Sequence, residues 1–240
     1  MAPADLIYEG KAKKVFKDSK GAETVILEFK DSLTAFNAQK KGSFENKGQV
    51  NRKIASLIFK YLSSHSVDSH FVEDIGSIHM RVKKVKIIPL EVVVRNILAG
   101  STAKKLGLID GTLLSEPLVE FYYKNDALED PFVSDDQIIM LKVAAKSDLN
   151  NLKTKALQIN SLLKKLFSEA GIDLVDFKIE FGFDQKNQIL LADEITPDCC
   201  RLWDQKTKEK LDKDRFRKDL GLVKESYEDV LARLSRLIKD

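Results

Sequence analysis

Charged residues alternate with apolar ones along residues 175–183, and this pattern is the strongest sign of chemistry in the sequence. Side chains two residues apart on a strand share a face, so Asp176, Lys178 and Glu180 lie on one side. The intervening apolar side chains enter a core, and they are Phe177, Ile179 and Phe181. The next predicted strand places Asp193 near Glu180 across the ladder. Two carboxylates with ligand phosphates are a common way to hold Mg²⁺. An exposed hairpin in which Lys178 neutralises one acid is the alternative.

Two further patterns are compatible with phosphate binding, although each has a simpler interpretation. Gly10 is followed by Lys11 and Lys13, where glycine lets the backbone approach a phosphate and two lysines on an extended segment point the same way. The segment lacks the P-loop pattern, and an ordinary basic turn is the alternative. Arg95 precedes a predicted helix that Ser101 would cap, and free N–H groups at a helix start attract anions. Plain capping is the alternative there.

The segment after the acidic hairpin adds a possible second phosphate clamp. Arg201 follows Pro197 and Asp198, where it would reach the same cleft, although a surface arginine is the simpler interpretation. Cys199 and Cys200 are adjacent, so we expect two reduced thiols rather than a disulfide. The three histidines lack the spacing of metal ligands.

The strands and helices expected around these residues indicate an α+β fold of antiparallel sheets with flanking helices. We expect a sheet-rich N-terminal lobe at 1–86 and a mixed lobe at 87–240, with the ligand cleft between them. Residues 35–48 are polar and aperiodic, which predicts a mobile loop. Predicted strands lie near 6–8, 14–16, 24–29, 71–72, 79–85, 90–94, 175–183 and 188–195. Predicted helices lie near 50–62, 101–107, 135–141, 147–170, 214–220 and 226–238.

Charge and hydropathy exclude several classes of protein. The 240 residues carry 40 basic and 37 acidic side chains, a net charge of +3, which is too balanced for binding nucleic acid through bulk charge. The N-terminal segment has no apolar core of a signal peptide, and no apolar run approaches the roughly 20 residues of a membrane span. We therefore expect a cytoplasmic protein with neither nucleic-acid nor membrane partners.

Six stretches of the chain together carry a resemblance to a known family. They are YEGKAKKVF at 8–16, VVVRNILAGS at 92–101, KNDALEDP at 124–131, VDFKIEFGF at 175–183, LADEITPDCCRLWD at 191–204 and DKDRFR at 212–217. With these stretches the chain resembles the SAICAR synthetases of purine biosynthesis. The resemblance covers the chain nearly end to end in one order. It implies a two-lobed fold related to ATP-grasp and kinase-like nucleotide-binding folds, in which 1–86 binds ATP and 87–240 holds the ribonucleotide and metal sites.

The resemblance also implies a reaction, in which a carbon–nitrogen ligase uses ATP to join L-aspartate to carboxyaminoimidazole ribonucleotide (CAIR). The products are SAICAR, ADP and phosphate. The implied ligands are ATP and Mg²⁺ besides the two substrates. A homodimer is expected, although the sequence itself does not show the oligomeric state.

The site residues implied by the resemblance fall into three groups. Gly10, Lys11 and Lys13 would bind the ATP phosphates, and Glu180 and Asp193 would hold Mg²⁺. These charged residues and Lys178 would form the catalytic set. The ribonucleotide would be bound by Arg95, Ser101 and Arg201 at its 5′-phosphate and by Asp176, Lys178 and Asp198 elsewhere. The 35–48 loop would close over the site, and DKDRFR would help to bind aspartate.

Two other functions remain open at this level. A small-molecule kinase also uses an Asp-x-Lys strand and two acidic metal ligands, but it would split ATP with an alcohol substrate and without aspartate. A non-catalytic nucleotide- or RNA-binding protein would show salt-sensitive binding and no turnover. The balanced charge and the lack of interleaved aromatic residues disfavour the second alternative.

Overall fold

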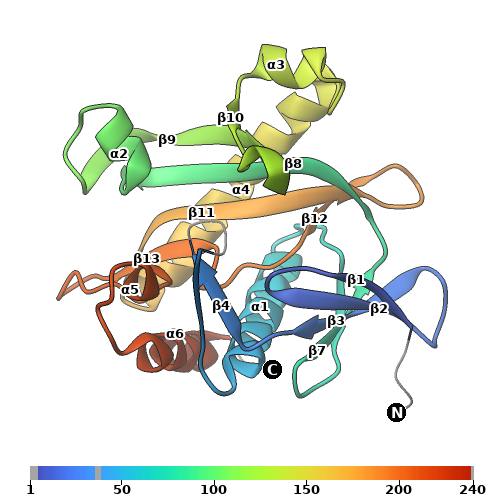
Figure 1. Ribbon diagram of the computed structural model, residues 1–240, viewed down its shortest axis with the longest axis horizontal. Coiled ribbons are helices and arrows are strands. Elements are labelled where there is room, and N and C mark those ends of the chain that lie inside the picture. Colours follow the sequence, from blue (N-terminus) through green and yellow to red (C-terminus); the bar gives the residue numbers. More distant parts are fainter. Residues whose placement is uncertain (1–4, 36–38, 239–240) are drawn as a thin grey trace. The chain divides into compact units, whose positions relative to one another are not determined.

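A computed structural model describes residues 5–35 and 39–238 as two compact units (Figure 1). The first unit comprises residues 1–87, 182–192 and 215–240, and the second comprises 88–181 and 193–214. Each unit combines antiparallel strands with helices, which confirms the predicted α+β class. The units are not continuous in sequence, because two later segments join the first. The assignment of ATP binding to 1–86 and of the other sites to 87–240 stays a prediction.

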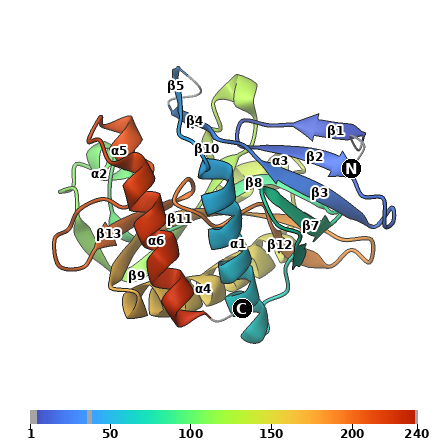
Figure 2. The same ribbon diagram turned by 90° about the horizontal axis from the view of Figure 1, so that it is seen from below.

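The first unit is built on a five-stranded antiparallel sheet in the order β1-β2-β3-β7-β6. Alternate residues of β3 are buried, and α1 packs against β3, β6 and β7. The helix α6 lies alongside α1 (Figure 2). The elements are β1 (Leu6–Glu9), β2 (Lys13–Lys17), β3 (Thr24–Phe29), β6 (Phe71–Asp74), β7 (His79–Lys83), β12 (Ile189–Ala192), α1 (Lys47–Ser64) and α6 (Val223–Leu237).

A small hairpin precedes α1 and corrects one prediction. Ser32–Ala35 (β4) pairs with Lys40–Ser43 (β5), so the loop predicted for 35–48 is wrong at residues 40–43 and from Lys47, where α1 begins. Residues 36–38 of that loop lie outside the described residues. A Cβ at Gly42 would come within 2.8 Å of the Phe216 ring. This strand therefore depends on packing against a distant part of the chain, which local periodicity does not reveal.

The second unit contains a sheet in the order β10-β9-β8-β11, with β13 also paired to β11. One face is apolar and lies toward α4, which contacts β9 and presents a buried stripe. The elements are β8 (Lys86–Leu98), α2 (Ser101–Lys105), β9 (Thr112–Tyr123), the 3₁₀ turn Asp126–Leu128, β10 (Phe132–Val133), α3 (Asp135–Met140), α4 (Lys146–Glu169), β11 (Ile172–Phe183) and β13 (Cys200–Asp204). The short helix α5 (Asp214–Arg217) begins at the last residue of this unit, and its other residues belong to the first unit.

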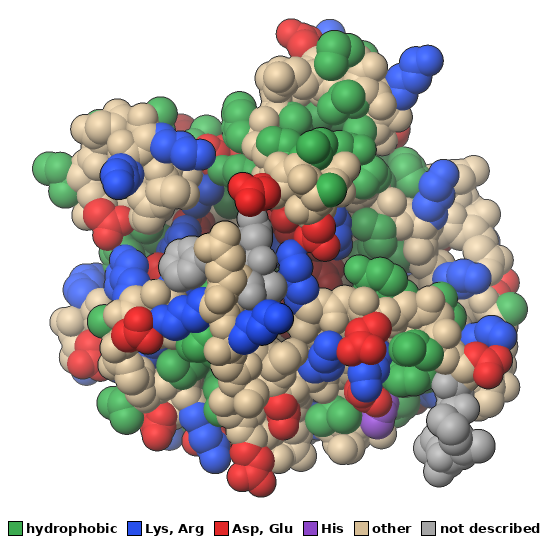
Figure 3. Space-filling view, viewed as in Figure 1, with side chains coloured by type: hydrophobic (Ala, Val, Ile, Leu, Met, Phe, Trp, Pro, Cys, Tyr) green, Lys and Arg blue, Asp and Glu red, His purple; other side chains and the backbone are tan. Residues whose placement is uncertain are grey.

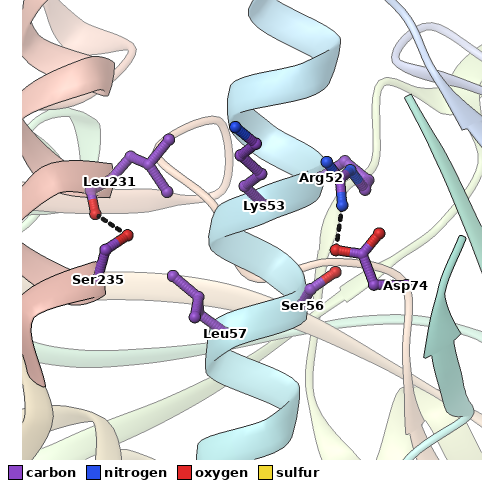
Figure 4. A pocket seen from close by; sticks show the side chains of 7 residues that line it. All are labelled: Arg52, Lys53, Ser56, Leu57, Asp74, Leu231 and Ser235. Carbon is purple, nitrogen blue, oxygen red and sulfur yellow. Dashed lines mark hydrogen bonds and ion pairs between the residues drawn. The ribbon is translucent and has the colours of Figure 1, made fainter. Parts of the chain in front are cut away.

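A groove of about 330 Å³ crosses α1 in the first unit and contains none of the predicted site residues (Figure 4). Arg52 in this groove pairs with Asp74, and the Ser235 hydroxyl donates to the Leu231 carbonyl at 2.8 Å. The other polar side chains that line it are Lys53 and Ser56. Because no predicted site residue lines the groove, we do not place the active site there.

The surface carries charges of both signs, interspersed over the face that Figure 3 shows. None of the helices in the described residues combines the length and apolarity that crossing a membrane requires. Exposed apolar side chains gather around α3 (Figure 3), and they are Leu128, Phe132, Ile139, Met140 and Leu141.

Gly48 provides a test of how the first unit packs. A Cβ at this position would lie 2.3 Å from the Phe29 backbone oxygen, which no side-chain rotation relieves. We expect Gly48→Ala to destabilise the protein by about 1–3 kcal/mol, outweighing the helix propensity that alanine adds. Thermal unfolding measures this effect. Lys53→Ala, at an exposed position of the same helix, should unfold near the wild-type temperature. If Gly48→Ala matched this control, the close approach of α1 to β3 would be wrong.

Candidate functional site

The polar face of the sheet in the second unit carries a row of charged side chains from three strands. Arg95 from β8 contacts Asp176 from β11, and Lys178 contacts Glu180 further along β11. The opposite side of β11 is apolar and buried, as predicted, through Phe177, Ile179 and Phe181. Asp176 and Glu180 are only 5% and 2% exposed. The alternative is therefore wrong in making the hairpin exposed, and these carboxylates need partners inside the protein. Its other part, a salt bridge from Lys178 to an acidic neighbour, is confirmed.

The ammonium group of Lys178 lies between the two carboxylates predicted to hold a metal. Its Nζ is 2.8 Å from Glu180 Oε1, 2.8 Å from Asp193 Oδ2 and 3.8 Å from Glu91 Oε1. A second ammonium, from Lys124, pairs with the other oxygen of Glu180. Glu180 and Asp193 are thus close together as predicted. The ammonium group of Lys178 brings them together, rather than a direct pairing of neighbouring strands.

Asp193 lies outside the strand in which the sequence pattern placed it. The predicted strand 188–195 ends at Ala192, and Asp193 takes a left-handed φ of 61°. This turn directs its carboxylate to Lys178. A period-two pattern predicts the strand but not the residue at which the backbone leaves it.

The electrostatics of this group keep Lys178 charged. Burial disfavours its charge, but Asp193, Glu180 and Glu91 together raise the pKa of Lys178 well above its usual value. Burial raises the pKa of Glu91, and Lys178 partly opposes that shift. Lys178 therefore supplies a fixed positive charge and is a poor proton acceptor near neutral pH.

Two arginines share one carboxylate oxygen in a second cluster. Arg95 Nη1 and Arg201 Nη1 each donate to Asp176 Oδ2 at 2.7 Å. Arg95 Nε also donates to Glu120 Oε2 at 2.7 Å, and Arg201 Nε donates to Asp214 Oδ2 at 3.2 Å. Burial disfavours the charge of Arg201, but its acidic neighbours raise the pKa. Both guanidinium groups are therefore charged and held in defined orientations.

The start of α2 lies against Arg201. A Cβ at Gly100 would come within 2.9 Å of Arg201 Nη2, so glycine permits this approach. The predicted cap at Ser101 is wrong, because Gly100 occupies the capping position and Ser101 is the first helical residue. Gly100 adopts a φ of 66° and donates its N–H to Asp110 at 2.8 Å. The structure brings Arg95, Arg201 and the residue before Ser101 into one neighbourhood.

The predicted phosphate loop lies in the first unit as a turn between β1 and β2. The Gly10 N–H donates to the Lys13 carbonyl at 2.8 Å, and the Lys11 carbonyl accepts from Ser32 Oγ at 2.8 Å. Lys13 begins β2, with its ammonium 5.5 Å from the Phe29 ring centre, whereas Lys11 is exposed in the bend. The two lysines therefore do not share one extended segment, contrary to the prediction.

The remaining predicted residues lie between Asp193 and the first residue of β13, which is Cys200. The Asp198 N–H donates to Thr196 Oγ1 at 3.3 Å. Cys199 and Cys200 are free thiols, as predicted. Burial raises the pKa of Cys200 well above its usual value, so this thiol stays protonated. Its small buried side chain fits a packing role.

A magnesium ion would find two protein ligands here rather than a complete cage. Within residues 5–35 and 39–238, no three His, Cys, Asp or Glu side chains gather as a metal site. Glu180 and Asp193 nevertheless converge on one cation and offer carboxylate oxygens. Mg²⁺ accepts one or two carboxylates when substrate phosphates and waters complete its octahedron, so these residues fit that ion.

Several members of both clusters were missed at the sequence level. The missed residues are Glu91, Glu120, Tyr122, Lys124 and Asp214. Glu91 and Arg95 are four residues apart on β8, and Glu120 and Tyr122 are two apart on β9, so strand periodicity contained a signal. It became informative only once the pairing of the strands was known.

A family model described as SAICAR synthetase matches residues 6–234. The chain belongs to the SAICAR synthetase family. This match confirms the family resemblance, and it favours a ligase over a kinase or a binding protein.

Relatives and solved structures agree with this membership. A phosphoribosylaminoimidazole-succinocarboxamide synthase of Campylobacter fetus is 54% identical over 235 residues, which cover 98% of this chain and 99% of the relative. The crystal structure of the Ehrlichia chaffeensis synthase has a TM-score of 0.94 and 44% identity, covering 96% of this chain and 98% of that one. A SAICAR synthetase in complex with ADP has a TM-score of 0.93 and 43% identity, covering 98% and 100%. The SAICAR synthetase fold predicted from the sequence is therefore confirmed.

One buried carboxylate near the arginine cluster gains or loses its proton close to neutral pH. Asp212 is fully buried and accepts from the Leu202 N–H at 2.8 Å and from the Asp214 N–H at 2.7 Å. Burial, with the nearby charge of Asp214, raises its pKa from 3.8 to about 7. The folded protein therefore binds this proton more tightly than the unfolded chain does. The stabilising contribution of Asp212 is complete below about pH 4 and is lost as pH rises to about 7.

Asp212→Asn removes this titration. We expect the thermal midpoint of the variant to rise relative to wild type between about pH 4 and pH 8, whatever its offset at low pH. Melting curves at several pH values measure the difference. The thermal midpoint of Glu209→Gln, a change at an exposed position nearby, should vary with pH as that of wild type does. If the curve of Asp212→Asn also ran parallel to wild type, the raised pKa would be wrong.

Proposed function

We propose that this chain ligates L-aspartate to the carboxylate of CAIR at the expense of ATP, giving SAICAR, ADP and phosphate in purine biosynthesis. The observation that carries the proposal is the match of residues 6–234 to the SAICAR synthetase family. The fold shared with a SAICAR synthetase in complex with ADP supports nucleotide binding. The two charged clusters supply the groups that the reaction requires.

The chemistry requires activation of a poor electrophile. An oxygen of the CAIR carboxylate attacks the γ-phosphorus of ATP, the bond to the bridging oxygen breaks, and ADP leaves. The acyl phosphate then reacts with the aspartate amine, which forms the amide bond, expels phosphate and loses a proton. The protein's contribution is positioning and charge neutralisation, and no nucleophilic side chain is needed.

The ATP phosphates are proposed to bind at the turn between β1 and β2. Gly10 allows the backbone to approach, and Lys11 and Lys13 supply positive charge. The exposure of Lys11 and the support of its carbonyl by Ser32 suit a turn that meets a ligand. Lys13, which is held beside Phe29, would supply the less mobile charge.

The proposed catalytic centre is the group around Lys178. Glu180 and Asp193 would hold Mg²⁺, which offsets the charge of the phosphates. Lys178, whose charge its neighbours secure, would orient these carboxylates and neutralise the reacting oxygens. We assign it no role as a base, because a proton acceptor for the aspartate amine needs a pKa nearer neutrality.

The ribonucleotide is proposed to bind at the arginine cluster. Arg95 and Arg201 would hold its 5′-phosphate together with Ser101 at the start of α2. The shared partner of both arginines, Asp176, would contact the ribonucleotide elsewhere, as would Lys178 and Asp198. The same carboxylate orients both guanidinium groups, which supports a pocket formed before the ligand arrives.

A cytoplasmic homodimer completes the proposal. Free thiols are typical of a reducing compartment, in which ATP is also available. The exposed apolar side chains around α3 form a surface of the kind that subunit contacts cover.

The first test is an assay of product formation with purified protein and Mg-ATP. We expect ADP release that requires both CAIR and L-aspartate, together with a product that contains the succinocarboxamide group. Chromatography with mass detection identifies that product. ADP release that is independent of aspartate, or no release at all, would contradict the ligase function.

Neutral isosteres at the proposed metal ligands test the catalytic centre. Glu180→Gln or Asp193→Asn should lower kcat by at least about 100-fold, because each removes a charge that the phosphates require. Circular dichroism should show a retained fold, since Lys178 keeps its remaining carboxylate partner. Asp173→Asn is a matched control on β11, where Asp173 pairs with exposed Lys208. This control should keep full activity, and a metal-ligand variant with a similar rate would exclude that residue from the metal site.

A further inference from the structure

Two buried amides link α4 to β8 directly beside the arginine cluster. Asn96 Nδ2 donates to Asn160 Oδ1 at 2.8 Å, and Asn160 Nδ2 donates to Asn96 Oδ1 at 2.9 Å. Asn96 Nδ2 also donates to the Leu174 carbonyl of β11 at 3.2 Å. The two side chains are 4% and 3% exposed. The pair therefore fastens one helix and two strands at a single point.

This point coincides with an interruption of the β8–β9 ladder. Arg95 lies opposite Leu118, but Ile97 lies opposite Leu113. Residues 114–117 of β9 thus stand opposite Asn96 alone, and they include a proline, which has no N–H to donate. Irregular pairing of this kind redirects nearby side chains and is frequent beside active sites. Immediately after Arg95, β8 therefore lacks a regular partner on its β9 side.

Strand geometry connects the amide pair to the arginine. Consecutive side chains of a strand point to opposite faces, so Asn96 faces α4 while Arg95 faces Asp176 and Glu120. Anchoring the Asn96 side chain fixes the backbone from which Arg95 departs. The direction of the guanidinium group is then set from both faces of the sheet.

We propose that Asn160 is a positioning residue for ribonucleotide binding, acting through Asn96 to hold Arg95 in its binding orientation where the β8–β9 ladder is interrupted. This inference rests on the proposed role of Arg95 at the 5′-phosphate. Asn160 hydrogen-bonds to Asn96, the residue after Arg95, and it lies in none of the six stretches that resemble the family.

The choice of residue supports positioning rather than simple packing. The neighbours of Asn160 on the buried stripe of α4 are apolar, and they include Ile159 and Leu163 at 1% and 0% exposure. A buried amide among such side chains loses its hydrogen bonds to water. Only well-aligned protein partners replace those hydrogen bonds. An apolar residue would pack there at lower cost but would not fix the strand.

The experiment compares steady-state kinetics of Asn160→Ala in the wild-type and Arg95→Lys backgrounds. We expect Asn160→Ala to raise KM for CAIR about tenfold, as for one weakened hydrogen bond to a charged group, with kcat and KM for ATP within about twofold of wild type. A remote anchor binds ground and transition states alike, so KM changes rather than kcat. In the Arg95→Lys background, Asn160→Ala should have little further effect, because lysine cannot reproduce the guanidinium geometry.

Leu163→Ala is the matched control for lost packing, one turn further along the same stripe. It should lower the thermal midpoint at least as much as Asn160→Ala and leave KM for CAIR unchanged. An equal rise in KM in this control, an equal effect of Asn160→Ala in both backgrounds, or no effect of Asn160→Ala would each overturn the inference. If Arg95→Lys itself left KM for CAIR unchanged, the proposed role of Arg95 would fall first, and the inference with it.

Discussion

Buried charge on the polar face of one sheet is the constraint on which the proposed site depends. Asp176 and Glu180 are almost completely enclosed, and burying a carboxylate is costly unless cations or hydrogen-bond donors pair with it. Each therefore has two, namely the arginines around Asp176 and the lysines around Glu180. The apolar side chains on the other face of β11 are buried in the core, and this packing holds the strand that carries the charged groups. The chemistry on one face and the core on the other are consequences of the same alternation.

This neutralisation shapes how ligands would bind. Arginines that already share a carboxylate are oriented before a phosphate arrives, so little side-chain entropy is lost on binding. The cost is competition, since the phosphate must attract guanidinium groups that Asp176 also attracts. The same holds for Glu180 and Asp193, whose shared ammonium occupies the place of a cation between two like charges. A metal ion at the proposed site would therefore compete with Lys178 for the same two carboxylates.

The sequence predicted the alternating face, the hairpin and most helices, because these follow from local periodicity. It also identified Arg95, Asp176, Lys178, Glu180, Asp193 and Arg201 as chemically distinctive, and the structure places them in two clusters. It did not predict β5, which depends on Phe216 from the C-terminal segment, or Gly100 as the cap of α2. Lys124 and Glu120 were missed because their significance depends on which strands are neighbours. Tertiary pairing, rather than local preference, decided each of these cases.

The amide pair shows why a polar residue can be worth its cost inside an apolar layer. Replacing paired buried polar groups with apolar ones often leaves stability unchanged, so stability alone does not explain Asn96 and Asn160. What an amide adds is direction, since its hydrogen bonds tolerate only small displacements. That property matters at Asn96, where the ladder with β9 is interrupted, and much less where regular pairing already fixes the strand. By the proposed role of Asn160, hydrogen bonds on the apolar face of the sheet, made from α4, would contribute to the geometry of the proposed binding site on the polar face.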